Sequence, residues 1–326
     1  MLDKKFNKLL CGYDEITVRY DTDSAAIWCY LNLKEHPCYT PKSLQEMHSL
    51  QLSIVEYFKS HHMNPKTPIR YLILASQTDG VFNYGGDLEL FSKFVAHKDR
   101  RSLSNYAQKC IDVIHLQSKN LNLPITTIAL VEGTALGGGF EAALSCDIII
   151  AQKDTKFGFP EIRYNLFPGM GAFSLLARRI GLQKTEEILT NGKIYTAQEL
   201  HRLGIVTILA EPNEGQKTLD KFIQKESRLF NGTQAIRSAK NIYNNIDYLE
   251  LLDISKVWVE AALKLKSKDL KLMKQLVRVQ TLKNIKQRVR TKQDRRIARQ
   301  VFSFPFTDYS NNIIQDDRRI TADRRA

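Results

Sequence analysis

The five cysteines of this 326-residue chain are scattered, and no two of them form a Cys-x-x-Cys pair. Their odd number and irregular spacing argue against both a disulfide framework and a zinc site. The seven histidines form no His-Glu-x-x-His motif, and the adjacent His61 and His62 lie in a polar stretch typical of a loop. We therefore expect no metal and no cofactor.

The chain also lacks a long hydrophobic run. No apolar stretch approaches the roughly 20 residues that span a bilayer, and the N-terminal residues lack the uninterrupted apolar segment of a secretory signal. We expect a cytoplasmic protein without a transmembrane segment. The composition, 43% hydrophobic and 25% charged, is sufficient for one large domain or two moderate ones with a sizeable core.

The basic charge is concentrated at one end of the chain. The net charge is +13, but residues 264–326 contain 18 Lys and Arg against 6 Asp and Glu, which leaves only +1 for residues 1–263. The charge therefore says little about the main domain, and we do not expect nucleic acid to be its partner.

Hydrophobic patterning predicts an α/β fold. Residues 15–32 predict a hairpin with its turn at Asp21–Ser24. Residues 40–60 predict a helix, with Pro41 early and Ser43 and Glu46 as a capping box. Short apolar runs at 69–76, 125–133 and 146–152 predict buried strands, with a helix over 102–121 between two of them. This alternation predicts a largely parallel sheet covered on both faces.

The C-terminal third is predicted to be helical. Beyond about residue 212 the strand signals fade, while apolar residues keep a helical period among basic ones. The final polar residues predict a frayed tail. We expect a core over residues 1–211, a helical region over 212–282, and a basic helical extension with a flexible tail over 283–326.

Three segments place glycines where an apolar strand ends: DGVFNYGGDLELF (79–91), GTALGGGFEAALSCD (133–147) and FGFPEIRYNLFPGMG (157–171). Ligands of open α/β sheets bind beyond the carboxyl ends of the strands, where glycine allows close approach to a backbone N–H group. The triple glycine matches no phosphate-binding motif, and no lysine follows it. Two glycine N–H groups would suit an oxyanion hole, although Gly85, Gly86 and Asp87 can also form a simple turn with Asp87 capping a helix.

Two glutamates follow these glycines. Glu141 lies in the first turn of the predicted helix, where it can also merely complement the helix dipole. Glu161 follows Phe159 and Pro160, and an apolar flank of this kind favours burial, which raises a carboxyl pKa towards the range useful for acid/base catalysis. With one strand predicted between them, the two carboxylates can face one cavity and transfer protons beside an oxyanion hole.

These segments, together with LTNGKIYTAQELHRLGIV (189–206), resemble the crotonase (enoyl-CoA hydratase/isomerase) superfamily over residues 12–280. The stretches FEAALSC, FPGMGAFS, YAQKC, VWVEAALKL and LMKQLVRVQ are most similar to the diffusible signal factor synthases, bacterial enzymes that make cis-2-unsaturated fatty acid signals. The resemblance implies a spiral of ββα units followed by a C-terminal helical region. It also implies a homo-oligomer built from trimers.

The resemblance assigns roles by position. Glu141 and Glu161 match the catalytic glutamates, and Gly86 and Gly138 match the oxyanion hole. The implied reaction is dehydration of a 3-hydroxyacyl thioester of acyl carrier protein followed by thioester hydrolysis, yielding a quorum-sensing signal for a sensor protein. Positions that we expect to contact the substrate, and that can equally be ordinary core, are Gly85, Leu136, Gly137, Met170, Trp258 and Leu276.

Other functions remain open. One is a conventional enoyl-CoA hydratase or isomerase that acts on CoA thioesters, and another is a binding protein without turnover. The chain departs from the superfamily at Thr207, where many members have Asp, and in its basic extension. That extension can contact acyl carrier protein, an anionic membrane or nucleic acid, or can keep the protein soluble; we favour a solvated tail or a carrier-protein contact.

Overall fold

The computed structural model describes residues 4–32, 37–61, 69–275, 306–307 and 313–314. The chain divides into two compact units, residues 1–281 and 282–326. In the second unit, two short strands that the sequence does not predict, β11 (Phe306–Thr307) and β12 (Ile313–Ile314), pair in antiparallel fashion. Leu276 and most of the basic extension lie outside the described residues. Within the described part, no helix has the length and apolar character needed to cross a membrane.

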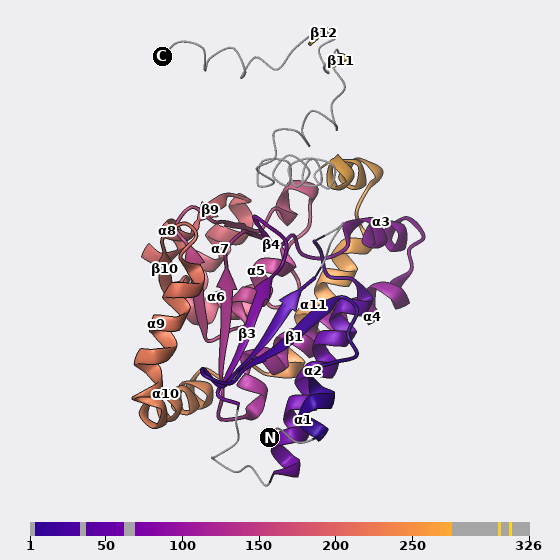
Figure 1. The fold of residues 1–326 in the computed structure, drawn as a ribbon. Helices are drawn as coiled ribbons and strands as arrows, with labels where there is room; N and C mark the ends of the chain where they lie inside the picture. Colours follow the sequence, from indigo (N-terminus) through magenta and orange to yellow (C-terminus); the bar gives the residue numbers. More distant parts are fainter. Residues whose placement is uncertain (1–3, 33–36, 62–68, 276–305, 308–312, 315–326) are drawn as a thin grey trace, which may run out of the picture. The chain divides into compact units, whose positions relative to one another are not determined.

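The main sheet of the first unit has six strands (Figure 1). The predicted hairpin, β1 and β2, is confirmed as the antiparallel pair, and every other neighbouring pair is parallel. The strands, in their order across the sheet, are β1 (Ile16–Asp21), β2 (Ala26–Leu31), β3 (Tyr71–Ser76), β5 (Thr126–Val131), β7 (Ile148–Gln152) and β10 (Ile208–Ala210).

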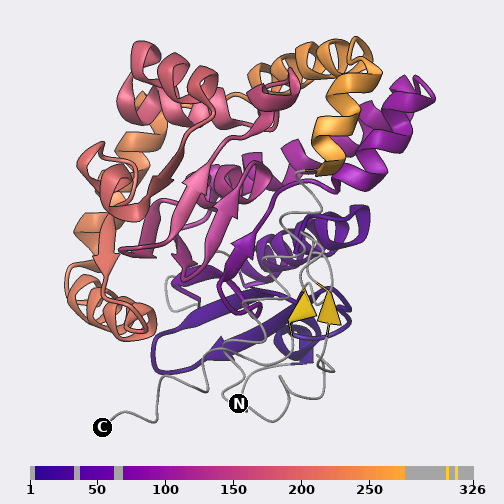
Figure 2. The same ribbon diagram turned by 90° about the horizontal axis from the view of Figure 1, so that it is seen from above.

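Both faces of this sheet are buried, as the apolar runs predict. Along β3, Leu72 and Leu74 join one hydrophobic cluster, while Tyr71 and Ile73 join another on the opposite face. The period of two follows from the pleat, which sends successive side chains to opposite sides. Leu219 of α9 packs in the second cluster, and Figure 2 shows the sheet between helices on both sides.

The first unit contains the two long helices that the hydrophobic periodicity predicts, α2 and α4. In chain order the helices are α1 (Lys4–Leu9), α2 (Pro41–Ser60), α3 (Leu88–Ala96), α4 (Arg100–Ser118), α5 (Gly138–Leu144), α6 (Ala172–Ile180), α7 (Leu182–Asn191), α8 (Ala197–Arg202), α9 (Gly215–Ser227), α10 (Phe230–Tyr243) and α11 (Tyr248–Leu263). Residues 267–275 are also helical, and two 3-10 turns are η1 (Asn120–Asn122) and η2 (Glu161–Tyr164).

A second, four-stranded sheet creates the repeating unit of the fold. Its strands, in order, are β4 (Val81–Asn83), β6 (Thr134–Leu136), β8 (Lys156–Gly158) and β9 (Ile194–Thr196). Three times, a strand of the main sheet is followed by a strand of this sheet and then by helical structure. The predicted α/β fold of ββα units followed by helices is therefore confirmed.

The predicted capping box of α2 is wrong by one turn. Thr40 is the N-cap and exchanges hydrogen bonds with Ser43: the Ser43 N–H donates to the Thr40 hydroxyl, and the Thr40 N–H donates to the Ser43 hydroxyl. Pro41 occupies the first turn, where its missing N–H group is no loss. The Glu46 carboxylate instead accepts N–H groups from residues 14–16, at 2.8 to 3.1 Å, and so ties α2 to the start of β1.

A methyl group added at Gly133 should destabilise the folded state. A Cβ there would lie 2.2 Å from the Val81 nitrogen and 2.3 Å from the Gly80 carbonyl carbon, and backbone atoms cannot yield as a flexible side chain can. We expect Gly133→Ala to destabilise the protein by about 3 kcal/mol or more. Urea denaturation measures the change.

Gly232→Ala is the matched control, since it adds the same methyl group within α10, where no atom other than the chain neighbours and the helix's own backbone lies within 4 Å of the added Cβ. We expect it to stabilise the protein by about 0.5–1 kcal/mol, because alanine loses less entropy in a helix. Equal denaturation midpoints for the two variants would contradict the steric argument.

Candidate functional site

The second sheet brings the three glycine-containing segments together. Strands β4, β6 and β8 are parallel neighbours, so their carboxyl ends lie at one edge of the sheet. Residues 85–87 follow β4, residues 137–141 follow β6, and residues 159–161 follow β8. Parallel pairing therefore converts three distant stretches of sequence into one site.

Two glycine backbones touch at this edge. Gly85 has φ +97°, and a Cβ on it would lie 2.7 Å from the Gly138 nitrogen. A Cβ on Gly138 would in turn lie 3.5 Å from the Gly86 nitrogen. Among the described residues, no backbone acceptor pairs with the N–H group of Gly86 or Gly138. Two neighbouring N–H donors are thus left for a ligand.

Glu141 is held firmly inside the protein. It lies in α5, is 2% exposed, and its Oε1 accepts N–H groups from Met170 at 2.9 Å and Ala172 at 3.0 Å. Burial raises the pKa of this carboxyl to about 7, while the two N–H donors oppose that rise. These donors favour the carboxylate form and fix its direction.

Glu161 is buried with fewer partners. It opens η2, and its Oε2 has no hydrogen-bond partner among the described residues. Burial, and then the negative charge of Glu141, raise its pKa to about 8. A Cβ on Gly137 would lie 2.5 Å from Oε1 of Glu161, so the glycine at that position makes room for the carboxylate.

The two carboxyl groups influence each other's ionisation. Since the charge of Glu141 disfavours ionisation of Glu161, the pair tends to retain one proton near neutral pH. One group then carries a proton while the other is ionised. Two strands, β7 and β8, separate them along the chain, rather than the one strand predicted from the sequence.

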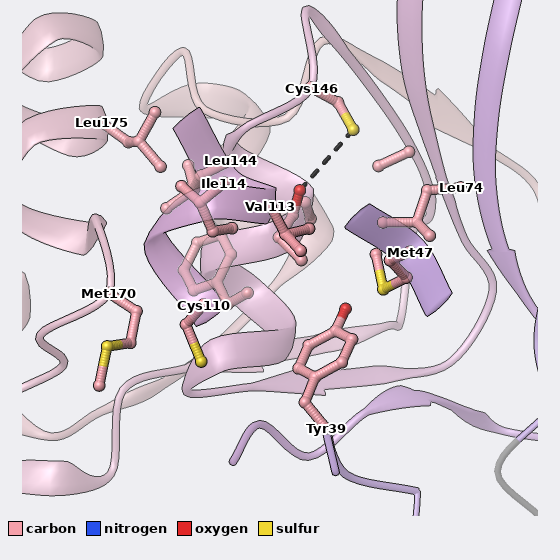
Figure 3. Packing of buried hydrophobic residues seen from close by; sticks show 14 of the residues in the cluster. Tyr39, Met47, Leu74, Cys110, Val113, Ile114, Leu144, Cys146, Met170 and Leu175 are labelled. Carbon is pink, nitrogen blue, oxygen red and sulfur yellow. Dashed lines mark hydrogen bonds between the residues drawn. The ribbon is translucent and has the colours of Figure 1, made fainter. Parts of the chain in front are cut away.

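One cavity of about 80 Å³ contains these groups: Gly86, Gly138, Glu141 and Glu161 all line it. The rest of its wall is mainly apolar. Figure 3 shows part of this wall as sticks, including Met47, Cys110, Val113, Ile114 and Met170. The cavity therefore places two carboxyl groups and two backbone N–H groups beside an apolar surface.

The other predicted substrate positions divide into three groups. Met170 and Trp258 line the cavity. Gly85 and Gly137 do not line it, but they pack against the Gly138 nitrogen and the Glu161 carboxylate. Leu136 is buried in β6 and is not part of the cavity wall, and Leu276 lies outside the described residues.

The cavity wall also contains three tyrosines that no sequence motif singled out as candidate site residues: Tyr39, Tyr106 and Tyr164. Tyr106 and Cys110 lie one helical turn apart in α4, in the stretch YAQKC, and that spacing was the available signal. Thr207, the departure from the superfamily, has a local role, because its hydroxyl accepts the Ile149 N–H at 3.1 Å. Within the described residues, no three His, Cys, Asp or Glu side chains form a potential metal site.

Comparison with known proteins gives consistent matches. The enoyl-CoA hydratase/isomerase family model matches residues 50–257. The mitochondrial methylglutaconyl-CoA hydratase of Mus musculus is 31% identical over 178 residues, which cover 54% of each chain. The chain thus spans about half the length of the curated relatives it matches.

Solved structures share the fold. The enoyl-CoA hydratase of Bacillus halodurans aligns with a TM-score of 0.65 and 21% identity, covering 80% of this chain and 98% of that one. DspI of Pseudomonas aeruginosa aligns with a TM-score of 0.59 and 21% identity, covering 71% and 88%. At these identities the likeness concerns the fold alone.

Removing the Glu161 carboxyl should change how stability depends on pH. Its pKa rises from 4.5 to about 8 on folding, so the folded state binds more protons than the unfolded state between those values. The stabilisation is complete below about pH 4.5 and is lost as pH rises through about 8. Wild type should therefore lose stability through this group between pH 5 and pH 9, whereas Glu161→Gln should not. We expect the free energy of unfolding of the variant, measured relative to that of wild type, to increase over this range by on the order of 1 kcal/mol or more.

Urea denaturation at pH 5, 7 and 9 tests this expectation. Glu89→Gln is the control, because that carboxyl is 70% exposed on α3. The burial argument fails if wild type and Glu161→Gln show the same pH dependence.

Proposed function

Because the chain belongs to the enoyl-CoA hydratase/isomerase family, we propose that its cavity adds water to, and removes water from, the C2–C3 bond of an acyl thioester. One observation carries the proposal: two buried carboxyl groups share a cavity with two backbone N–H groups that have no acceptor in the described part of the chain. Acid/base transfer next to a carbonyl needs that combination.

In this mechanism, Gly86 and Gly138 act on the thioester carbonyl. Their N–H groups donate to its oxygen, which gains negative charge when C2 is deprotonated. Such a donor is typically worth about 2.7–4 kcal/mol in the transition state. The backbone contact at Gly85 holds the two donors in place before the substrate arrives, so little reorganisation is needed.

The glutamates transfer the protons. In hydration, the Glu141 carboxylate takes a proton from water as the oxygen bonds to C3, and protonated Glu161 gives its proton to C2. The N–H donors to Glu141 favour its charged form, whereas burial of Glu161, whose Oε2 has no hydrogen-bond partner among the described residues, favours its neutral form. Dehydration runs the same steps in reverse: the C2–H and C3–O bonds break, the double bond forms and water leaves.

Removing either carboxyl should abolish most hydration activity. We expect Glu141→Gln and Glu161→Gln each to lower kcat for 2-enoyl-CoA by at least about 100-fold, since a positioned acid or base contributes roughly that much. Wild-type kcat/KM should be bell-shaped between about pH 7 and 8, falling in acid as Glu141 is protonated and in base as Glu161 ionises. Steady-state kinetics across pH measures both effects. Full turnover in either variant, with exposed Glu89→Gln as the control, would contradict the roles assigned.

A finer proposal concerns the product. We propose that the natural thioester is carried by acyl carrier protein and that its hydrolysis releases a cis-2-unsaturated fatty acid, which a sensor protein detects. The motifs FEAALSC and FPGMGAFS support it, and the fold shared with DspI is compatible with it. Water attacking the carbonyl carbon in the same oxyanion hole would form the C–O bond of the acid and break the C–S bond, with the proton of the water passing through one of the two carboxyl groups to the departing thiolate. The named relatives favour the alternative, a hydratase that acts on CoA thioesters.

The product formed distinguishes a synthase, which releases a free acid, from a hydratase, which leaves the thioester intact. Purified protein is incubated with 3-hydroxyacyl chains of several lengths on acyl carrier protein and on CoA, and the products are identified by mass spectrometry. A synthase releases free 2-enoic acid from the carrier-protein substrate, and the Glu141→Gln, Glu161→Gln double variant releases none. Reversible hydration of CoA esters without free acid would eliminate the synthase and leave the hydratase.

A further inference from the structure

Tyr106 of α4 contacts the loop that supplies one oxyanion donor. Its hydroxyl donates to the carbonyl of Tyr39 at 2.7 Å and accepts the N–H of Asp87 at 3.3 Å. Asp87 directly follows Gly86, and a Cβ on Gly86 would lie 3.1 Å from the same hydroxyl. The Tyr106 side chain therefore packs directly against the peptide units on which the donor depends.

The peptide bond between Gly85 and Gly86 explains why this contact matters. The Tyr39 N–H donates to the Gly85 carbonyl at 2.6 Å, and residues 39 and 86 form a parallel β-bridge. The Gly85 carbonyl and the Gly86 N–H belong to one planar unit, so fixing the direction of the carbonyl fixes that of the N–H. Tyr39 therefore aims the Gly86 donor.

The Tyr106 hydroxyl completes the link on the other side. It joins the Tyr39 carbonyl to the Asp87 N–H, so Gly86 lies between two hydrogen-bonded attachments to Tyr39. Tyr84 adds a further bond, its N–H donating to the Pro37 carbonyl at 2.7 Å. Without the hydroxyl, the Asp87 N–H would lose this acceptor, and the peptide unit that follows Gly86 would be held less firmly against Tyr39.

We propose that Tyr106 is a positioning residue that orients the Gly86 N–H towards the thioester carbonyl. This inference rests on the proposed function, since it assigns a use to the donor at Gly86. Tyr106 acts through the backbone and does not itself exchange a proton with the substrate. Its loss therefore affects polarisation of the carbonyl and leaves the carboxyl pair unchanged.

Kinetics of Tyr106→Phe test the proposal, because this substitution removes the hydroxyl and keeps the ring. We expect kcat for 2-enoyl-CoA to fall about tenfold or more, less than loss of a whole donor. KM should stay within about twofold, and the pH profile should keep its two apparent pKa values. Tyr248→Phe is the matched control. The Tyr248 hydroxyl of α11 donates to Asp112 of α4, the helix that contains Tyr106, at 2.8 Å, but Tyr248 does not line the cavity. We expect Tyr248→Phe to retain wild-type kcat.

Infrared difference spectroscopy gives a readout that a purely structural role would not move. In a Glu161→Gln background, which we expect to slow turnover by at least about 100-fold, the carbonyl band of bound 2-enoyl-CoA should shift to higher frequency when Tyr106→Phe is added, because the carbonyl is less polarised. Tyr248→Phe should leave the band in place. Unchanged kcat and an unchanged band in folded Tyr106→Phe overturn the proposal.

A second substitution covers the case in which Tyr106→Phe does not fold. Tyr106→3-fluorotyrosine keeps the ring and the hydroxyl but weakens the hydroxyl as an acceptor for the Asp87 N–H. We expect the carbonyl band to move relative to wild type, and the same replacement at Tyr248 not to move it. An unmoved band for the Tyr106 replacement contradicts the proposal.

The same measurements distinguish failure of the proposed function from failure of the Tyr106 role. Wild-type protein that turns over no acyl thioester contradicts the proposed function itself. Active wild type, inactive Glu141→Gln and fully active Tyr106→Phe contradict only the positioning role.

Discussion

The backbones of residues 85–86 and 137–138 pack against each other, and the candidate site depends on this contact. A side chain at Gly85 would overlap the Gly138 nitrogen, and one at Gly137 would overlap the Glu161 carboxylate. The contact exists because β4 and β6 run parallel and end at one edge of the small sheet. Glycine is thus required twice, once to bring two N–H groups together and once to admit a carboxyl group beside them.

Burial of the two carboxyl groups raises their pKa values. An ionised group away from water is disfavoured, so both pKa values rise towards neutrality, where a group can both take up and release a proton. Glu141 and Glu161 differ because only Glu141 receives N–H donors from the Met170 segment. The environment, rather than the residue type, therefore gives the two carboxyl groups different pKa values.

Much of the fold was predictable because the signals are local. The hairpin, the long helices α2 and α4 and the buried strands follow from turn residues and periodicity, and the structure confirms them. The capping box of α2 was assigned to the wrong residues, because Glu46 is used by the distant backbone of residues 14–16. The sequence also placed Leu136 among the substrate contacts, whereas this side chain lies outside the cavity wall.

The sequence by itself determined which residues can do chemistry: glycines after apolar strands, and glutamates next to them. Their roles as oxyanion donors, acid and base stay predictions. Tertiary structure alone decided that four of these residues share one cavity, and that Tyr39 and Tyr106 join them from segments 67 positions apart. The physical reason is that sheet pairing and hydrogen bonds between distant segments depend on three-dimensional register, which local sequence patterns do not encode.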